Sequence, residues 1–374
     1  MTEGPLSLVF LGLSLSSSWG NGHATTYRAL LKGLAARGHQ VTFLEREQPW
    51  YAANRDLVRP SYCDLLFYDD LSSLQQEQSD RIAEADAVIL GSYLPDGVAV
   101  GEWVLDQAQG LVGFYDIDTP ITLARLDRGD REYLAPELVP RLDFYLSFTG
   151  GPLLERLAGN HGARLPVAFY CMVDEDLYRP TGDQTHWDLG YLGTYAEDRQ
   201  PAVERLLIEP ARRLPGKRFV VAGPQYPSTI EWPANVERIE HLPPAEHARF
   251  YSSCRFTLNV TRQEMVKAGW SPSVRLFEAA ACGSAILSDP WPGLDEIFPP
   301  DEALLTVADS QSVVDALSAR EGDRANRLAR RARQRVLAEH TGERRAAQLE
   351  EVLKQASAAN ARGTQEEKRY ALSS

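Results

Sequence analysis

Short apolar runs alternate along the chain with stretches of helical spacing, and Gly- or Ser-rich loops separate them. In the first half, the runs that predict buried strands are 6–11, 41–44, 87–90, 111–115, 144–148 and 167–170. In the second half, they are 188–192, 218–222, 236–239, 256–260 and 285–287. Helical spacing of apolar positions is clearest at 23–37, 100–108, 309–319 and 323–355. Strands that alternate with helices are typical of parallel sheets, so the pattern predicts an α/β chain with two such sheets.

The chain has 374 residues, of which 44% are hydrophobic and 24% are charged, and this is enough for two globular domains. We expect an N-terminal Rossmann-like domain over 1–179 and a second one over 180–319. A long helix over 320–356 is expected to return to the domain junction. The polar stretch 357–374 has few bulky apolar residues and predicts a mobile tail.

The charge balance limits the classes of partner. A formal net charge of -13 argues against a nucleic-acid or anionic-membrane surface, because such partners need positive potential. No run of about eighteen apolar residues and no signal-like N-terminus occurs, so we expect no integral membrane segment and a soluble cytoplasmic protein. The four cysteines are scattered without metal-type spacing. We therefore expect no metal site and no cofactor.

The stretch SPSVRLFEAAACGSAILSD is the most informative part of the sequence. Ser271 and Ser273 suit a loop and a helix N-terminus, and Val274 begins an apolar helical face. Free amides at such a helix start attract anions, and Arg275 adds a positive charge. One turn later, Glu278 is placed to accept hydrogen bonds from ribose hydroxyls. These residues predict a nucleotide diphosphate site; the alternative is a solvated ion pair between Arg275 and Glu278.

The loop after the first predicted strand contains Gly20, Asn21, Gly22 and His23. Small residues there would let the backbone approach a ligand closely, which makes this loop a candidate for the acceptor side. The alternative is that the glycines only reverse the chain.

Two acids follow the run 111–115, at the sheet edge where open α/β folds bind ligands. Asp116 or Asp118 could remove a proton from an acceptor hydroxyl. The alternative is that Asp118 and Thr119 only cap a turn or helix.

In the second half, Tyr226 lies in the loop after 218–222 and is a candidate for stacking on a nucleobase. Arg262 directly precedes the SPSVRLFEAAACG stretch and is a candidate for phosphate binding.

Three motifs carry a resemblance to a known family: SPSVRLFEAAACG, YDIDTP at Tyr115–Pro120 and FTGG at Phe148–Gly151. In these the chain resembles the CgeB-like (spore maturation protein) family of GT-B glycosyltransferases. The resemblance runs from about Leu6 to about Leu317. It implies two Rossmann-like domains facing a cleft, with Cys171–Pro180 crossing between them.

The resemblance also implies that the second domain binds a nucleotide sugar and the first presents the acceptor. The turn with Gly193, Thr194 and Arg199 would then face the donor diphosphate. Arg199, Arg262 and Arg275 together would stabilise charge on the leaving group in place of a divalent ion. One departure is that retaining relatives often carry an acid eight positions before the ribose glutamate, where this chain has Trp270.

The sequence thus predicts glycosyl transfer from a UDP- or dTDP-sugar to an unidentified glycan, protein or small molecule. The resemblance favours retention of configuration, whereas Asp116, Asp118 or His23 as a base would permit inversion. Two other functions remain open: a sugar-nucleotide epimerase, and a non-catalytic protein that binds sugar nucleotides or takes part in coat assembly.

Overall fold

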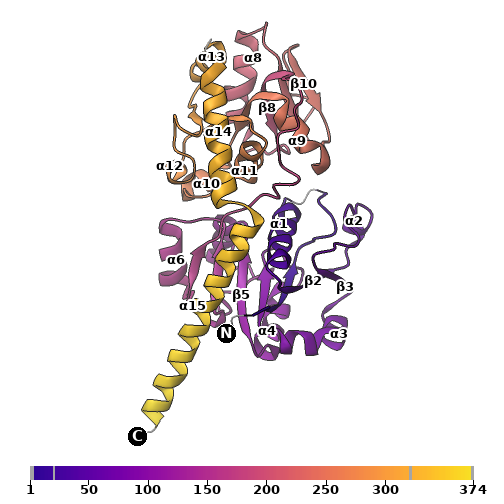
Figure 1. Cartoon of the computed structure of the whole chain (residues 1–374), viewed down its shortest axis with the longest axis vertical. Coiled ribbons are helices and arrows are strands. Elements are labelled where there is room, and N and C mark those ends of the chain that lie inside the picture. Colours follow the sequence, from indigo (N-terminus) through magenta and orange to yellow (C-terminus); the bar gives the residue numbers. More distant parts are fainter. Residues whose placement is uncertain (1–3, 20–21, 320–321, 372–374) are drawn as a thin grey trace. The chain divides into compact units, whose positions relative to one another are not determined.

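The computed structural model describes residues 4–19, 22–319 and 322–371 and divides into two compact units (Figure 1). The first unit runs to Met172 and takes up the chain again at Gly342. The second unit is Val173–Thr341, so it begins shortly before Pro180. The chain therefore passes from one unit to the other twice.

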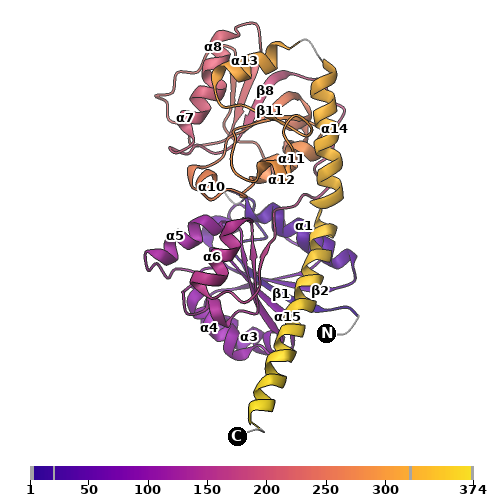
Figure 2. The ribbon, with the colours of Figure 1, turned by 90° about the vertical axis from the view of Figure 1, so that its left-hand side faces the viewer.

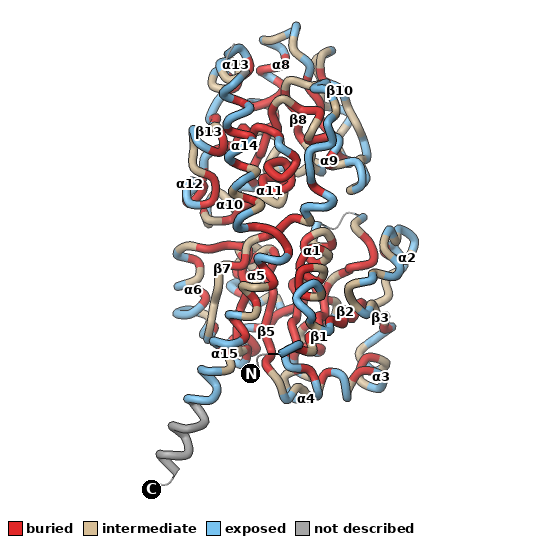
Figure 3. The backbone as a smooth tube through the Cα atoms, viewed as in Figure 1, coloured by how far each residue is buried: buried red, intermediate tan, exposed pale blue. Residues whose placement is uncertain are grey.

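The first unit contains a parallel seven-stranded sheet with the strand order β3-β2-β1-β4-β5-β6-β7. Its strands are β1 Ser7–Gly12, β2 Gln40–Arg46, β3 Asp64–Tyr68, β4 Ala87–Gly91, β5 Leu111–Asp116, β6 Phe144–Ser147 and β7 Pro166–Ala168. The central strand β1 is paired on both sides, with Leu8 beside Val41 of β2 and beside Ala87 of β4. The central strands are buried along nearly their whole length (Figure 3), which explains why they are continuous apolar runs.

Helices cover both faces of this sheet. They are α1 His23–Ala36, α2 Pro49–Ala52, α3 Leu71–Glu84, α4 Gly97–Gln107, α5 Thr119–Asp127, the 3₁₀ turn Val139–Arg141, α6 Pro152–His161 and α15 Gly342–Ala371. On one face α15 lies along α1, and on the other α3 packs against α4 (Figure 2).

The second unit contains a parallel six-stranded sheet with the order β10-β9-β8-β11-β12-β13. Its strands are β8 Trp187–Leu192, β9 Phe219–Ala222, β10 Val236–Ile239, β11 Cys254–Asn259, β12 Ala285–Ser288 and β13 Leu305–Thr306. This is the 3-2-1-4-5-6 order of a Rossmann sheet, in which ligands bind at the carboxyl ends where the strand order reverses. Here the reversal lies between β8 and β11.

The helices of the second unit also form two layers. They are α7 Gln200–Val203, a π-helical turn Glu204–Ile208, α8 Glu209–Arg213, α9 Pro244–Ser252, α10 Gln263–Ala268, α11 Val274–Ala281, α12 Leu294–Ile297, α13 Ser310–Ser318 and α14 Gly322–Glu339. Helices α9 and α14 pack against α11 over one face, and α13 packs against α8 over the other.

The structure confirms the predicted α/β class with two Rossmann-like sheets, but differs in three details. The edge strands β3 and β13 were not predicted, because one is only partly buried and the other has two residues. The single helix expected over 323–355 is wrong: it is broken at His340–Thr341, where Val173 donates its N–H to the His340 carbonyl (2.9 Å). Beyond that break α15 continues to Ala371, past the point where a tail was expected to begin.

Candidate donor site

Helix α11 begins at the carboxyl edge of the second sheet, next to the strand-order reversal. The Ser273 hydroxyl caps it by accepting a hydrogen bond from the Arg275 amide (3.2 Å), as the sequence predicts for an N-cap serine. Val274, the first helical residue, is half-buried, while Ser271 is buried and its hydroxyl contacts the sulfur of Met265 (3.1 Å). The helix start is thus built from the residues that the sequence singled out.

Arg275 ties this helix to the ends of two strands. Its Nε donates to the Leu192 carbonyl at the end of β8 (2.6 Å), and its Nη1 donates to Oδ1 of Asn259 at the end of β11 (3.0 Å). The guanidinium also stacks over the ring of Tyr191, at 4.8 Å from the centroid. Its residue exposure is only 7%, so the side chain is a fixed part of the edge.

Two unused donors converge on Gly193. A Cβ at this glycine would lie 2.9 Å from both Nη2 of Arg275 and Oη of Tyr191. The Tyr191 hydroxyl is buried and has no hydrogen-bond partner in the described part of the chain. Nη2 takes part in none of the hydrogen bonds that Arg275 makes among the described residues. Burying a hydroxyl without a partner costs about 1–3 kcal/mol, so the Tyr191 hydroxyl favours a hydrogen-bonding ligand at this turn.

The other predicted phosphate ligands lie on the neighbouring loops. Arg199 donates from Nη2 to the Thr194 carbonyl (2.7 Å), and its buried Nε has no partner among the described residues. Arg262 is about half exposed and its Nε lies 3.7 Å from a carboxylate oxygen of Asp198. Both guanidiniums therefore stand at the same edge as Arg275, with Arg262 the more solvated.

Tyr226 belongs to an aromatic cluster beside Gly193. Its hydroxyl donates to the Gly193 carbonyl (3.1 Å), and its ring contacts those of Tyr195 and Trp232 at 5.6 and 5.5 Å. The Arg238 guanidinium stacks on Tyr226, at 4.2 Å from the ring centroid. One face of the Tyr226 ring is thus already occupied by a cation.

Glu278 is held by residues that the sequence analysis missed. Tyr251 of α9 donates its hydroxyl to Oε2 of Glu278 (3.0 Å), and the Tyr178 hydroxyl lies 3.3 Å from Nδ1 of His247. Nδ1 of His247 lies 4.0 Å from Oε2 of Glu278. Because Glu278 is only 6% exposed and Arg275 bonds elsewhere, the alternative of a solvated ion pair between them is wrong.

Trp270 stands where retaining relatives often carry an acid, and it packs against the loop that contains Pro292 and Gly293. Its amide donates to the Pro292 carbonyl (2.6 Å), and its ring covers Gly293, where a Cβ would lie 2.4 Å away. It anchors the loop before α11 instead of offering a carboxylate.

In the first unit, Asp116 is fully buried at the end of β5. It accepts hydrogen bonds from the Tyr145 hydroxyl (2.5 Å) and the Thr122 hydroxyl (2.8 Å). Burial raises the pKa of this carboxyl to about 6, although those hydrogen bonds favour its charged form. Asp116 therefore links the end of β5 to Thr122 of α5 and Tyr145 of β6, and it has no exposed surface.

Asp118 and His23 lie together with a tyrosine. Tyr93 donates its hydroxyl to Oδ2 of Asp118 (3.1 Å), and its ring lies 5.4 Å from that of His23. Burial lowers the pKa of His23, and the nearby Asp118 charge partly offsets this. Of the predicted acceptor loop, Gly22 immediately precedes α1, whereas Gly20 and Asn21 lie outside the described residues.

The comparisons with known proteins bear first on the fold. Residues 199–351 match the family model described as "Glycosyl transferase-like". Sucrose-phosphate synthase from Thermosynechococcus elongatus superposes with a TM-score of 0.67 at 15% identity, covering 94% of this chain and 100% of its own. HepE from Anabaena, in complex with UDP and glucose, gives 0.67 at 12% identity with the same coverage.

An α-glucosyltransferase in complex with UDP-glucose and DNA gives 0.68 at 12% identity, covering 93% of this chain and 98% of its own. No curated protein matches the chain. The chain has the GT-B fold of glycosyltransferases. Its two Rossmann-like units correspond to those that the sequence resemblance implied, whereas the CgeB-like subfamily stays a prediction.

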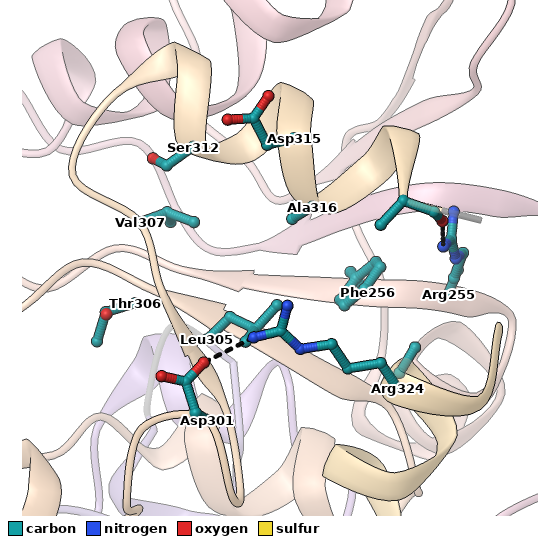
Figure 4. Close-up of a pocket in the computed structure, with 12 residues that line it drawn as sticks. Arg255, Phe256, Asp301, Leu305, Thr306, Val307, Ser312, Asp315, Ala316 and Arg324 are labelled. Atoms are coloured by element: carbon teal, nitrogen blue, oxygen red, sulfur yellow. Dashed lines mark hydrogen bonds and ion pairs between the residues drawn. The ribbon is translucent and has the colours of Figure 1, made fainter. Parts of the chain in front are cut away.

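One cavity of this GT-B chain lies away from the residues above. It has a volume of about 340 Å³ and opens between β13, α13 and the start of α14 (Figure 4). Phe256 and Leu305 are among its apolar lining residues, and an ion pair between Asp301 and Arg324 lies at its side. No residue of the α11 start or of the loops after β8 and β9 lines it, so it is separate from the candidate donor site at the carboxyl edge of the second sheet, here called the donor edge.

The described residues contain no group of three His, Cys, Asp or Glu side chains placed to hold a metal ion. Among the same residues, no helix is both long and apolar enough to cross a bilayer.

Proposed function

We propose that this protein transfers a sugar from a nucleotide diphosphate sugar to an acceptor, with the donor held by the second unit. The observation that carries the proposal is the pair of unused donors, Nη2 of Arg275 and Oη of Tyr191, at the Gly193 turn. They lie beside the start of α11 and at the strand-order reversal, where doubly wound sheets bind phosphates. The glycosyltransferase-like match over 199–351 contains α11 but not the Gly193 turn, so it supports the proposal from a separate observation.

The diphosphate becomes the leaving group, and negative charge develops on its oxygen as the bond to the sugar breaks. Arg275 is fixed by three contacts before any ligand binds, so it stabilises this charge without reorganising. Arg199, whose buried Nε has no partner in the part of the chain that the structure describes, and Arg262 add positive charge from the adjoining loops. We propose that these guanidiniums act in place of a divalent ion.

Glu278 receives the ribose in this proposal. Its carboxylate is oriented by Tyr251, and each carboxylate oxygen has more than one lone pair to offer. Tyr226, next to Gly193, is the candidate neighbour of the base. Two of the similar proteins form complexes with UDP and glucose or with UDP-glucose, which supports a UDP-sugar over a dTDP-sugar here.

The first unit binds the acceptor, and His23 is the group best suited to take a proton from it. Its lowered pKa keeps the imidazole neutral near pH 7, and Asp118 lies close enough to stabilise the imidazolium that forms. Asp116 is assigned a supporting role because it is buried and already accepts two side-chain hydrogen bonds. The motifs SPSVRLFEAAACG, YDIDTP and FTGG support a relation to the CgeB-like family within this class.

Tyr191→Phe separates ligand binding from structural support. The variant removes a buried hydroxyl that has no partner among the described residues, so the melting temperature should stay the same or rise. UDP affinity, measured by calorimetry, should fall about 5- to 10-fold, which corresponds to roughly 1–1.4 kcal/mol. Tyr145→Phe is the matched control: it removes a tyrosine hydroxyl that does have a partner, Asp116, in the other unit. It should lower stability and leave UDP affinity unchanged.

A panel of UDP-, dTDP- and GDP-sugars tests the wider proposal, since a ligand that binds only the folded state raises the melting temperature. We expect a UDP-sugar to do so and to be consumed only when an acceptor is supplied. Conversion of the sugar without acceptor would indicate an epimerase, and tight binding without turnover a binding protein. If no nucleotide bound, or if Tyr191→Phe bound UDP as well as wild type, the donor site would lie elsewhere.

A further inference from the structure

The first unit exposes two tryptophans at one edge of its sheet. Trp19 is 51% exposed and Trp50 is 52% exposed, and Val58 nearby in the sequence is 65% exposed. Trp19 follows β1 and Trp50 lies in α2, directly after β2. Because β1 and β2 are parallel neighbours, their carboxyl ends and the loops after them meet at the same edge.

Hydrogen bonds fix these two loops to each other. The Ser17 hydroxyl donates to the Asn54 carbonyl (2.8 Å), and the Asn54 side chain donates to the Trp50 carbonyl (2.7 Å). The Ser16 carbonyl accepts the amides of Asp56 (3.1 Å) and Leu57 (3.0 Å). The loops thus form one surface, here called the tryptophan platform (Trp19, Trp50 and the loop residues 14–18 and 54–58).

A buried carboxylate holds the platform from below. Glu45 of β2 accepts four hydrogen bonds from the first loop: the Ser14 and Ser16 hydroxyls at 2.8 and 2.7 Å, and the Leu15 and Ser16 amides at 2.7 and 2.8 Å. The side of α2 packs inward through Tyr51, whose ring contacts that of Trp50. The exposed indoles therefore stand on an ordered base, which reduces the entropy lost when a ligand binds.

The charged residues of the platform limit the classes of ligand that it can bind. Arg28 is bonded to Asp56 (2.6 Å), and Arg55 is bonded to Glu47 and stacks on Phe67. Arg59, an exposed neighbour of Val58, is then the remaining basic residue of these loops. Anionic membranes are bound by clusters of several basic residues, so the platform does not suit such a membrane. The loops that carry the indoles also carry polar side chains such as Ser18 and Asp56, which hydrogen-bond each other, so this surface is not the continuous apolar groove that an acyl chain needs.

We infer that the tryptophan platform binds a carbohydrate, which makes the acceptor of the proposed transfer a glycan or another sugar-bearing molecule. A pyranose ring has an apolar C–H face that stacks on an indole and a rim of hydroxyls that pair with exposed polar side chains of the same loops, such as Asn54 and Asp56. Tryptophan suits this because it supplies a large rigid contact area at low entropic cost. The inference that the bound carbohydrate is the acceptor rests on the proposed function, but the platform belongs to the first unit and the proposed donor site to the second.

The test uses the full chain and its Trp50→Ala, Trp50→Phe and Trp19→Ala variants. The probes are neutral oligosaccharides of glucose and of N-acetylglucosamine, with binding measured by calorimetry and by tryptophan fluorescence. We expect at least one saccharide to bind the wild type and to bind each alanine variant about 10-fold more weakly, with Trp50→Phe in between. Leu177→Ala removes an exposed apolar side chain from the second unit and should change nothing.

Two further measurements keep the outcomes distinct. UDP affinity should be the same in the wild type and in all tryptophan variants. If the wild type did not bind UDP, that result would count against the donor site and not against the platform. Vesicles of phosphatidylcholine and phosphatidylglycerol are added in a separate arm. Vesicle binding that depends on Trp50, saccharide binding that ignores both tryptophans, or no saccharide binding by a protein that binds UDP would each overturn the inference.

Discussion

Glu278 and Asp116 are two buried carboxylates in different units, and each accepts a hydrogen bond from at least one hydroxyl group. Tyr251 donates a hydrogen bond to Glu278, while Tyr145 and Thr122 donate hydrogen bonds to Asp116. Hydroxyl donors orient a carboxylate without neutralising it. The difference is in position: Glu278 lies on α11 next to the donor edge, whereas Asp116 has no exposed surface.

Asp116 makes stability depend on pH in a predictable direction. Its pKa is about 6 in the folded protein, mainly because of burial, against about 3.8 in the unfolded chain. A raised carboxyl pKa means that the folded state binds the proton more tightly, so this contribution is fully present below about pH 4 and is lost as pH rises to about 6. The integrated loss is about 3 kcal/mol at high pH.

The Asp116→Asn variant isolates this effect. Unfolding of wild type and variant is followed in urea between about pH 4 and pH 7, and the wild type should lose stability relative to the variant across that window. Other titrating groups are common to both proteins and cancel in the difference. A stability difference that stays constant over the window would show that Asp116 does not titrate there.

At the scale of elements, α15 is held on α1 by close backbone packing and by one charged cluster. The N–H of Arg37 Nε and the His39 ring both bond Glu350 of α15, at 2.6 and 2.8 Å, and they lower the pKa of Glu350 to about 2, with the Arg37 hydrogen bond as the largest cause. Near the start of α15, a Cβ at Gly33 would lie 2.3 Å from the Gly342 carbonyl oxygen. Only glycine lets the two backbones approach this closely.

Gly33→Ala should therefore destabilise the first unit although alanine is the better helix former. The new methyl cannot fit against backbone atoms, so we expect a loss of about 1–3 kcal/mol, typical of overpacking. The matched control is Gly159→Ala in α6, where a Cβ would meet nothing within 4 Å and the higher helix propensity of alanine should add up to about 1 kcal/mol. Thermal unfolding of both variants gives the comparison, and equal melting temperatures would refute the close-packing argument.

At the scale of the whole molecule, the sequence predicts those strands that are continuous apolar runs. Every predicted strand is present, because strands buried on both faces are continuous apolar segments. The edge strands β3 and β13 escaped prediction because one is only partly buried and the other has two residues. The helix break at Thr341 escaped it because its cause is pairing with Val173, which is distant in the sequence. The same holds at the site: Arg275 and Glu278 stand in a local motif, whereas Tyr178, Tyr191 and Tyr251 join them only through the fold.

The last prediction concerns the balance of charge at the donor edge of a protein with a net charge of -13. The acids at this edge already have partners: Asp198 lies near Arg262, Asp289 accepts from Thr261, and Glu278 accepts from Tyr251. In the proposed function, the guanidiniums of Arg199, Arg262 and Arg275 supply the positive charge that a diphosphate leaving group needs. Sugar transfer or donor hydrolysis should therefore proceed at full rate in EDTA, whereas Arg275→Lys, which cannot keep both strand-end bonds, should lose at least about 10-fold. Activity that is lost in EDTA and restored by magnesium or manganese would assign this role to a metal ion, and the arginines would then position the donor and not replace the ion.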